Sequence, residues 1–465
     1  MNRAATMDER ADPPERPHAD ARFEELRERE FARLDAAECT YLDYTGSGLY
    51  AESQIRSHAD LLSRSVLGNP HSRNPTSTAS TELVERARLR VAEFFAADPD
   101  EYEVIFTPNA SGALKLVAES YPFAAGSRFL LTADNHNSVH GMREYARAGN
   151  AEIRYVQLDR ELRAADLEGA LAGADPDAPN LFVYPAQSNF SGVKHPLEWI
   201  ETARSAGYDV MLDAAAFVPT SRLSLRALHP EFVCLSFYKM FGFPTGVGAL
   251  LCCKRAIGRL QRPWFAGGTV RFTSAGSGVR LLHDTARAFE DGTVNYLDIA
   301  AIPAGLDLLE GVGMENVNRH VMRLTEMLLE RLRELRHAGG APLACVYGPP
   351  DTEDRGGTVA FNLLGADGHP IDFRLVEERT NAANVSLRTG FFCNPGAAEF
   401  AFDYRNDEVR RCAGTLTAET FTIQQFSVCI GEKPVGAVRV SLGIASDEGD
   451  VERLMEVLRS FGESG

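Results

Sequence analysis

The sequence predicts an α/β protein built on a mostly parallel sheet with helices on both faces. Short apolar runs of strand length alternate with helical patterns between residues 104 and 252. Such alternation is typical of parallel strands joined by helical crossovers. The predicted strands are Val104–Phe106, Arg128–Leu131, Ile153–Val156, Leu181–Tyr184, Val210–Leu212, Phe232–Leu235 and Val247–Cys252.

The 465 residues exceed what one compact core holds, so we expect more than one domain. The composition of residues 1–20 predicts a disordered tail. Residues 21–300 are expected to form a large domain with an N-terminal arm, and residues 301–465 a smaller α+β domain. Helical spacing marks Phe23–Leu34, Ser80–Ala96, a helix from Ala113, Leu197–Ala206, Asp298–Leu309 and Glu315–Arg336.

The net charge of −17 argues against a nucleic-acid partner or an anionic membrane, since both bind preferentially to basic protein surfaces. No apolar run approaches the roughly 20 residues of a membrane span, and the N-terminus lacks the apolar core of a secretory signal. The eight cysteines are scattered without a Cys-x-x-Cys pair. We therefore expect a cytoplasmic protein whose cysteines are mostly buried as small apolar residues.

A single lysine, Lys239, follows the predicted strand Phe232–Leu235 and precedes a turn that contains Gly242, Pro244 and Gly246. Buried lysines are rare because the ammonium loses its water. One use of such a lysine is Schiff-base chemistry, in which a desolvated amine of lowered pKa bonds a carbonyl group. A solvent-facing loop lysine is the alternative, and for an isolated lysine it is the commoner case.

Polar side chains follow several predicted strands at the point where each strand ends. Ligands of open parallel sheets bind beyond the carboxyl ends of the strands. We therefore expect the following side chains to converge on one crevice: Ser111, His136, Asn189, Asp213, Ser236 and Lys239.

Together these residue types suit pyridoxal phosphate, and no metal is expected. The turn 107–112 opens a helix whose backbone N–H groups, with the Ser111 hydroxyl, can hold a phosphate; an ordinary capped turn is the alternative. Asp213 can pair with a protonated ring nitrogen or cap a helix. His136 can stack on a flat ring or form hydrogen bonds within its own loop. Asn189 can bond a phenolic oxygen or shape a turn.

Six stretches carry a resemblance to the class V aminotransferase group of fold-type I pyridoxal-phosphate enzymes. Within this group the chain resembles cysteine desulfurases and is most similar to the N-terminal domain of molybdenum cofactor sulfurases. The resemblance implies a fold-type I large domain, pyridoxal 5′-phosphate as cofactor, and a homodimer with shared sites. The stretches are residues 134–144, 212–216, 236–246, 267–269, 388–396 and 436–443, of which the lysine and Arg-Thr-Gly-x-x-Cys stretches are the most specific.

The resemblance also implies a role for each matching residue. Lys239 is implied to bond the cofactor aldehyde and later to move the substrate α-proton, with Asp213 on the pyridinium, His136 stacked on the ring and Asn189 on the ring oxygen. The implied phosphate ligands are Ala110, Ser111 and Ser236, joined by Thr269 from the other subunit. Arg439 is implied to clamp the substrate carboxylate, with a surface arginine on an edge strand as the alternative. Arg388 is implied to assist it or to shape the cysteine loop.

Cys393 is the second catalytic candidate that the resemblance supplies. In the family, the cysteine at this spacing attacks the substrate sulfur and leaves alanine and a persulfide. Such attack requires thiolate, which an ordinary cysteine of pKa near 8.5 forms only when it is activated. Asn394, Pro395 and Gly396 follow Cys393 in a loop, which favours access. A buried structural cysteine is the alternative.

The chain departs from the family pattern at four places. Phe391 and Ala398 stand where similar proteins often carry further cysteines, which makes a sulfur relay through this loop doubtful. Ala216 and Tyr238 stand where many desulfurases have glutamine and histidine, and both departures resemble the sulfurase branch. The sequence ends at residue 465 without a molybdenum-cofactor-binding domain, so on this route we expect the sulfur acceptor to be a separate protein.

Three functions remain open from the sequence. The first is a cysteine desulfurase that converts L-cysteine to alanine and transfers the sulfur to an acceptor protein or cofactor. The second is another pyridoxal-phosphate reaction on an amino acid, such as a β-lyase, epimerase or transaminase in secondary metabolism, because a fold does not fix a reaction. The third is a non-enzymatic relay or scaffold, against which Lys239, Asp213 and Arg439 argue.

Overall fold

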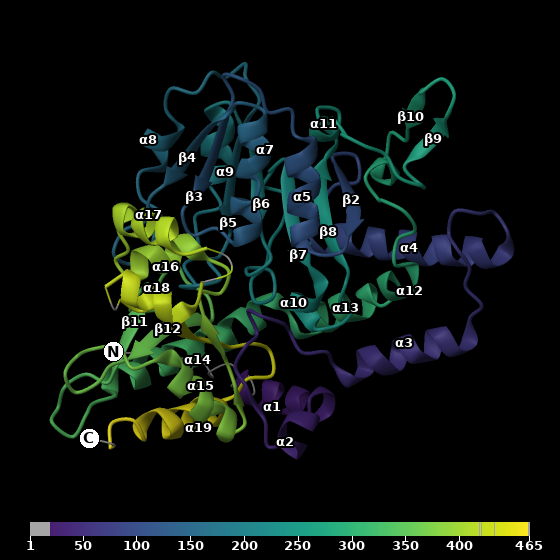
Figure 1. Cartoon of the computed structure of the whole chain (residues 1–465). Helices are drawn as coiled ribbons and strands as arrows, with labels where there is room; N and C mark the ends of the chain where they lie inside the picture. Colours follow the sequence, from purple (N-terminus) through teal and green to yellow (C-terminus); the bar gives the residue numbers. More distant parts are fainter. Residues whose placement is uncertain (1–18, 418, 420, 432, 464–465) are drawn as a thin grey trace, which may run out of the picture.

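The structure is a computed structural model of the chain, and it describes residues 19–417, 419, 421–431 and 433–463. The predicted tail lies outside the described residues except for its last two, which begin helix α1 (Ala19–Glu30). Figure 1 shows one large sheet in the upper part of the molecule and a smaller sheet below it. None of the described helices is long and apolar enough to cross a membrane.

The upper sheet has seven strands in the order β2-β8-β7-β6-β5-β3-β4. Only β8 runs antiparallel to its neighbours β2 and β7, so the sheet is mostly parallel and the predicted α/β class is confirmed. The strands are β2 (Tyr102–Thr107), β3 (Arg128–Thr132), β4 (Glu152–Val156), β5 (Asn180–Pro185), β6 (Tyr208–Asp213), β7 (Phe232–Ser236) and β8 (Gly248–Cys253).

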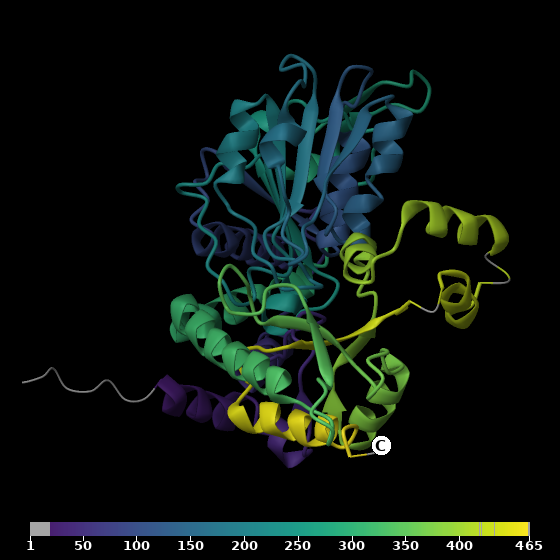
Figure 2. The ribbon, with the colours of Figure 1, turned by 90° about the vertical axis from the view of Figure 1, so that its left-hand side faces the viewer.

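Helices cover both sides of this sheet, as the edge-on view in Figure 2 shows. Helix α5 packs on β7 and β8, and α9 packs on β6. The elements around the sheet are α4 (Pro75–Phe94), α5 (Ala110–Ser120), α6 (Asn137–His140), α7 (Arg143–Ala148), α8 (Leu167–Leu171), α9 (Trp199–Ser205), α10 (Phe237–Phe241), α11 (Lys254–Ile257), β9 (Val270–Thr273), β10 (Arg280–Leu282), η1 (Ala286–Ala288), α12 (Tyr296–Ile299) and α13 (Ile302–Val312).

The lower sheet is antiparallel, in the order β11-β12-β15-β14, and its strand β15 is therefore an interior strand. The N-terminal segment also lies here, because β1 (Thr40–Tyr41) pairs with β13 (Val385–Ser386). The predicted boundary near residue 300 stays a prediction. The remaining elements of this part are α2 (Arg33–Ala36), α3 (Glu52–Arg64), β11 (Ala344–Tyr347), β12 (Thr358–Leu363), β14 (Arg388–Gly390), β15 (Ala437–Ser441), α14 (Met314–Glu334), α15 (Phe373–Ala382) and α19 (Glu448–Arg459).

A helical arm follows α16 (Pro395–Ala401) and stands away from the rest of the chain in Figure 2. It contains α17 (Asn406–Thr415) and α18 (Ile423–Cys429), which a disulfide joins through Cys412 and Cys429. The expectation of reduced cysteines is therefore wrong for this pair, although Cys412 is fully buried as expected. The spacing of 17 residues gives no motif that marks it. Among the free cysteines, Cys345 and Cys393 are exposed.

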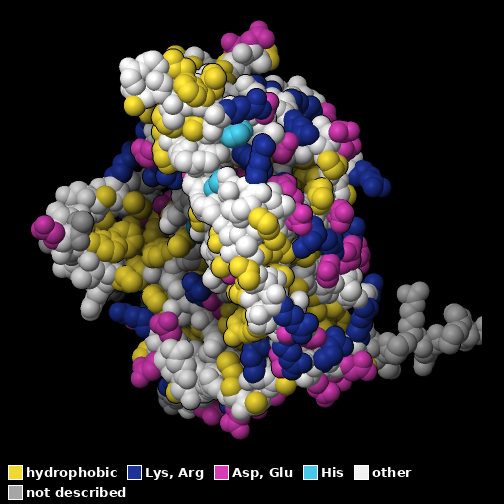
Figure 3. Space-filling view, turned by 90° about the vertical axis from the view of Figure 1, so that its right-hand side faces the viewer, with side chains coloured by type: hydrophobic (Ala, Val, Ile, Leu, Met, Phe, Trp, Pro, Cys, Tyr) yellow, Lys and Arg dark blue, Asp and Glu magenta, His cyan; other side chains and the backbone are white. Residues whose placement is uncertain are grey.

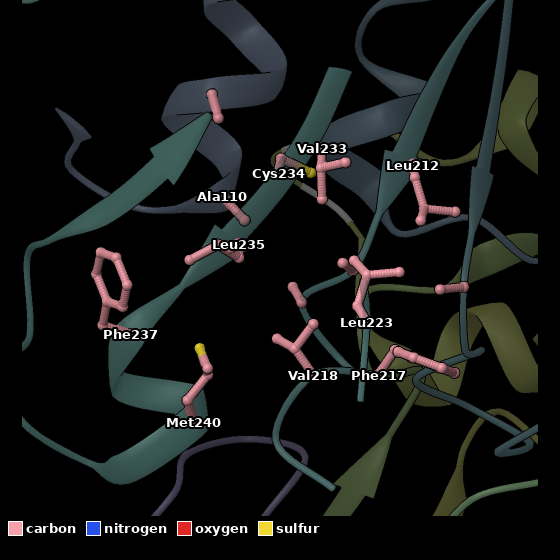
Figure 4. Close-up of a cluster of buried hydrophobic side chains, with 14 of the residues drawn as sticks. Ala110, Leu212, Phe217, Val218, Leu223, Val233, Cys234, Leu235, Phe237 and Met240 are labelled. Atoms are coloured by element: carbon pink, nitrogen blue, oxygen red, sulfur yellow. The ribbon is translucent and has the colours of Figure 1, made fainter. Parts of the chain in front are cut away.

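The core beneath the β7–α10 junction holds that junction in place. Figure 4 shows Leu235, Phe237 and Met240 in a cluster of buried hydrophobic side chains that also includes Leu212 of β6 and Val218 and Leu223 of the segment after it. Leu235 is fully buried. Because a buried leucine leaves a cavity when it is truncated, its removal costs more than the lost transfer free energy alone.

We expect Leu235→Ala to lower the free energy of unfolding by about 2–5 kcal/mol, measured by urea denaturation. Leu89→Ala is the matched control, since Leu89 on α4 is 56% exposed and its truncation is expected to change stability by less than about 0.5 kcal/mol. Equal effects of the two substitutions would contradict this packing.

Candidate active site

A pocket lies at the carboxyl ends of β5, β6 and β7, beside the first turn of α5. All six polar residues that the sequence places at strand ends line its wall. The lining residues are Asn109, Ala110, Ser111, Leu114, His136, Pro185, Gln187, Asn189, Asp213, Ala215, Ala216, Ser236, Tyr238 and Lys239. The pocket therefore joins an amine, a carboxylate, an imidazole and a helix N-terminus.

Lys239 lies on α10, the short helix that directly follows β7. Phe237 and Met240 of this helix are buried in the core, while Lys239 lines the pocket. Gly242 ends the helix with φ +77°, and a Cβ there would collide with the backbone of Tyr50. Burial lowers the pKa of Lys239, and Asp213 opposes this shift while Arg439 adds to it. More of the amine is thus neutral, and nucleophilic, at a given pH than in an exposed lysine.

Asp213 is the last residue of β6 and Ser236 the last of β7, so both reach the pocket directly from the sheet. One Asp213 oxygen accepts a hydrogen bond from the Ala215 backbone at 3.0 Å. The Ser236 hydroxyl accepts from the Ala110 backbone at 2.8 Å, which ties the lysine strand to the start of α5.

The N-terminus of α5 forms another side of the pocket. Asn109 caps the helix by accepting from Gly112 at 2.9 Å, and the Ser111 hydroxyl lies 2.6 Å from that of Ser138. The first N–H groups of a helix have no partner within it and carry a partial positive charge. The Ala110 N–H is used by Ser236, so Ser111 and the positive end of the helix are the groups placed to face an anion such as a phosphate.

His136 is the N-cap of α6, and its Nδ1 accepts from the Ser138 backbone at 3.1 Å. Burial lowers the pKa of His136; Lys239 adds to the shift and Asp213 opposes it. The ring is therefore neutral at neutral pH. A flat, uncharged ring on the wall of the pocket suits stacking against an aromatic ligand.

Asn189 lines the pocket, but its amide is engaged by the cysteine loop. Its Nδ2 donates to the Phe392 carbonyl at 2.7 Å, and its Oδ1 accepts from Asn394 at 2.9 Å. The predicted contact with a ring oxygen has to compete with these two bonds. Gln187, which the sequence analysis missed, lines the same pocket and has a buried Oε1 with no hydrogen-bond partner among the described residues.

The Cys393 loop is held in an unusual backbone conformation. Phe392 and Cys393 both have φ +54°, the left-handed region that non-glycine residues seldom adopt. Such a conformation persists only where surrounding contacts impose it. The Cys393 carbonyl accepts from the Asn137 backbone at 2.7 Å, beside His136. The loop is thus fixed to the strand-end loops that line the pocket.

Asn394 is the main anchor of this loop and is fully buried. Its Nδ2 donates to the Asp134 carbonyl at 2.6 Å and to Asn189 Oδ1, while its Oδ1 accepts from the Ala397 backbone at 3.1 Å. Cys393 itself is exposed and does not line the pocket wall. The loop therefore presents an open thiol from a rigid support beside the pocket.

Arg439 and Arg388 lie next to the pocket, and Asp43 joins them. Arg439 is buried on the interior strand β15, so the alternative of a surface arginine on an edge strand is wrong. Its Nη2 lies 2.7 Å from Asp43 Oδ1, and Arg388 Nη2 lies 2.7 Å from Asp43 Oδ2. No local sequence signal marks Asp43, because its partners are 396 and 345 residues away.

Thr269 lies outside the pocket, and its side chain is fully buried in its own loop. The hydroxyl donates to the Ala266 carbonyl at 2.8 Å and accepts from the Ala266 backbone at 3.0 Å. A single chain therefore gives this hydroxyl no route to a phosphate. The predicted contact with the partner subunit's phosphate stays a prediction, and it requires the loop to rearrange or to use a backbone group.

Most of the sequence also matches a known protein family. The sequence model of the family described as aminotransferase class-V matches residues 40–454. The chain belongs to the aminotransferase class-V family. As the sequence predicts, it is a pyridoxal-phosphate-dependent enzyme by fold and family.

Two curated proteins similar to this chain are molybdenum cofactor sulfurases. The chain is 38% identical over 457 residues to that of Homo sapiens, with 93% of this chain and 51% of the relative covered. It is 39% identical over 452 residues to molybdenum cofactor sulfurase 2 of Culex quinquefasciatus, with 92% and 57% covered. The class-V chain described here thus spans about half the length of the curated relatives it matches.

Two solved structures of cysteine desulfurases share the fold. The apo structure of a cysteine desulfurase from Thermococcus onnurineus NA1 aligns with a TM-score of 0.78 at 23% identity, covering 95% of this chain and 98% of the other. A cysteine desulfurase from Escherichia coli, in an S-sulfonic acid form, aligns with a TM-score of 0.72 at 20% identity, covering the same shares.

The pocket of this class-V chain fits pyridoxal 5′-phosphate. The positive end of α5, with the Ser111 and Ser236 hydroxyls beside it, suits its phosphate. Asp213 offers a carboxylate to a ring nitrogen, Lys239 an amine to an aldehyde, and the orphaned Gln187 amide a further polar contact.

Replacing Asn394 with alanine is expected to release the cysteine loop, because the substitution removes three hydrogen bonds that hold a strained backbone. Amide hydrogen exchange in the peptide spanning residues 388–398 should accelerate by roughly tenfold or more. Asn406→Ala, on the exposed start of α17, is the control and should leave this peptide unchanged. Unaltered exchange in Asn394→Ala would show that other contacts fix the loop.

Proposed function

We propose that this protein is a cysteine desulfurase, which takes sulfur from L-cysteine and holds it as a persulfide on Cys393. The observation that carries the proposal is the exposed Cys393 thiol on a loop bonded to Asn137 and Asn189, which flank the pocket of Lys239. A β-lyase, epimerase or transaminase has no need for such a fixed, accessible thiol. The names of the sulfurase and desulfurase relatives support the same choice.

Each group of the chain has a task in this proposal. When bound, pyridoxal phosphate supplies an electron sink that weakens bonds at the substrate α-carbon. The start of α5 and Ser236 hold the phosphate, Asp213 keeps the ring nitrogen protonated, and His136 stacks on the ring. Lys239, whose pKa is lowered by burial, accepts and returns the α-proton. Arg439 and Arg388 orient the substrate carboxylate.

The sulfur transfer balances without an added oxidant or reductant. The Cys393 thiolate forms a bond to the substrate sulfur as the carbon–sulfur bond breaks. The electron pair of that bond stays with the substrate carbon, which gains a proton and becomes the methyl group of alanine. The transferred sulfur remains on Cys393 as a persulfide, and its next acceptor is a protein or cofactor that can approach this exposed loop.

We also propose a homodimer. An apolar surface extends over the hairpin β9–β10 and the loop before it, on the face that Figure 3 shows. Contiguous exposed apolar surface of this kind marks an interface in many proteins. Its members are Trp264 (48% exposed), Phe265 (39%), Phe272 (55%), Val279 (48%) and Leu281 (57%). The Thr269 loop lies between these residues in the sequence, which supports shared sites.

The proposed reaction needs Cys393 as a free thiol, which supports a reducing compartment such as the cytoplasm. Six of the cysteines are free in the structure, in agreement with this proposal. The Cys412–Cys429 disulfide is the one feature of the described residues that points the other way.

Substituting Cys393 with alanine tests the proposal. Alanine formation from L-cysteine by the pyridoxal-phosphate-loaded enzyme is expected to fall by roughly a hundredfold or more, because the nucleophile is lost. The absorbance of the bound cofactor should persist, since Cys393 does not line the pocket. Cys345→Ala is the control, because Cys345 is also exposed but lies on β11. Undiminished alanine formation in Cys393→Ala would refute the desulfurase and favour a lyase or transaminase.

A further inference from the structure

Arg388 and Arg439 face each other directly across the strands β14 and β15. Like charges at directly opposed positions destabilise an antiparallel pair. Arg439 is only 2% exposed, so water does little to relieve this repulsion. A negatively charged side chain of the protein is therefore needed to neutralise the two arginines.

Asp43 supplies that anion from the opposite end of the chain. Its Oδ1 lies 2.7 Å from Arg439 Nη2, and its Oδ2 lies 2.7 Å from Arg388 Nη2 and 3.0 Å from Arg388 Nε. One carboxylate thus bridges both guanidinium groups, with a bidentate bond to one of them. Charge-assisted bonds of this geometry are the strongest hydrogen bonds that side chains form.

The backbone around Asp43 fixes the bridge in place. Asp43 pairs with Ser441 at the end of β15, and the Thr45 backbone donates to the Ser441 hydroxyl at 2.8 Å. Gly46 turns back over the carboxylate, and a Cβ there would collide with Asp43 and lie 2.7 Å from Arg388 Nη2. The backbone therefore holds the Asp43 carboxylate in a fixed position, unlike the side chains of most surface ion pairs.

The bridge leaves Arg439 little capacity for a second carboxylate. Its Nη1 donates to the Asn189 carbonyl at 3.1 Å, and its Nη2 is bonded to Asp43. Its Nε is buried and has no hydrogen-bond partner among the described residues. Two of the five N–H donors of this guanidinium are thus engaged, and a third, on Nε, is buried. An incoming carboxylate therefore meets an arginine that Asp43 already binds, and it competes with Asp43 for that charge.

We propose that Asp43 is a positioning residue that sets the affinity for the substrate carboxylate, because it holds Arg388 and Arg439 in place and competes with that carboxylate for them. The inference rests on the proposed function only in taking these arginines as the carboxylate-binding groups. Competition from an internal carboxylate weakens ground-state binding of any amino acid. A purely structural role for Asp43 predicts the opposite change in affinity when it is neutralised, since misplaced arginines bind worse.

The test is Asp43→Asn in the pyridoxal-phosphate-loaded full-length chain. L-alanine, the proposed product, and inorganic sulfate are the two probes. Dissociation constants come from the change in cofactor absorbance and from the thermal shift of the protein. Both probes are expected to bind roughly tenfold more tightly to Asp43→Asn than to the unaltered protein. Asp43→Glu, which keeps the charge, should stay within about threefold of the unaltered protein.

Asp35→Asn is the matched control, because Asp35 lies on the same N-terminal segment and pairs with Arg27 instead. It should leave both dissociation constants unchanged. If Asp43→Asn does not fold, Asp43→Ser and titration of the unaltered protein with sulfate take its place. Weaker or unchanged binding to a folded neutral variant would overturn the inference, as would tight sulfate binding by the unaltered protein.

The two proposals fail separately. If the unaltered protein forms no alanine from L-cysteine but Asp43→Asn binds sulfate more tightly, the desulfurase proposal fails and the role of Asp43 stands. If alanine forms at a measurable rate and Asp43→Asn binds both probes more weakly, only the role of Asp43 fails.

Discussion

The site depends on the shared direction of strands β3, β5, β6 and β7. Because these strands are parallel, the segments that follow their carboxyl ends emerge at one edge of the sheet. That edge brings His136, Asn189, Asp213 and Lys239 to one pocket although they are spread over a hundred positions of the chain. Antiparallel β8 lies between β7 and β2, so β2 runs in the same direction as β7 and its carboxyl end leads into α5 at the same edge.

The lower sheet adds groups that the upper sheet lacks. Strands β14 and β15 carry Arg388 and Arg439, and the loop after β14 carries Cys393. Hydrogen bonds from Asn394 to the Asp134 carbonyl and from Asn189 to the Phe392 carbonyl join this loop to the upper sheet. The relative position of the thiol and the lysine is therefore set by short polar bonds between buried groups, which are costly to leave unmade.

Local sequence pattern sufficed for the sheet and for the strand-end residues, because apolar periodicity and turn residues are local signals. It could not reveal contacts between distant segments. Asp43 follows a short apolar run and has no motif of its own, and its role appears only when β1 is placed beside β13. The resemblance implies a contact between Asn189 and a ring oxygen, and no local signal shows that the same amide also bonds Phe392 and Asn394. Which partner a side chain selects depends on tertiary packing, and the same holds for the Cys412–Cys429 pair.

The central claim is that the Lys239 amine lies in this pocket where it can form a covalent bond to an aldehyde. The most direct measurement is incubation of the full-length chain with pyridoxal phosphate, borohydride reduction, proteolysis and mass analysis of every lysine peptide. The account predicts one phosphopyridoxyl group per chain, on the peptide that contains Lys239. Modification confined to exposed lysines such as Lys115, or no modification at all, would contradict it.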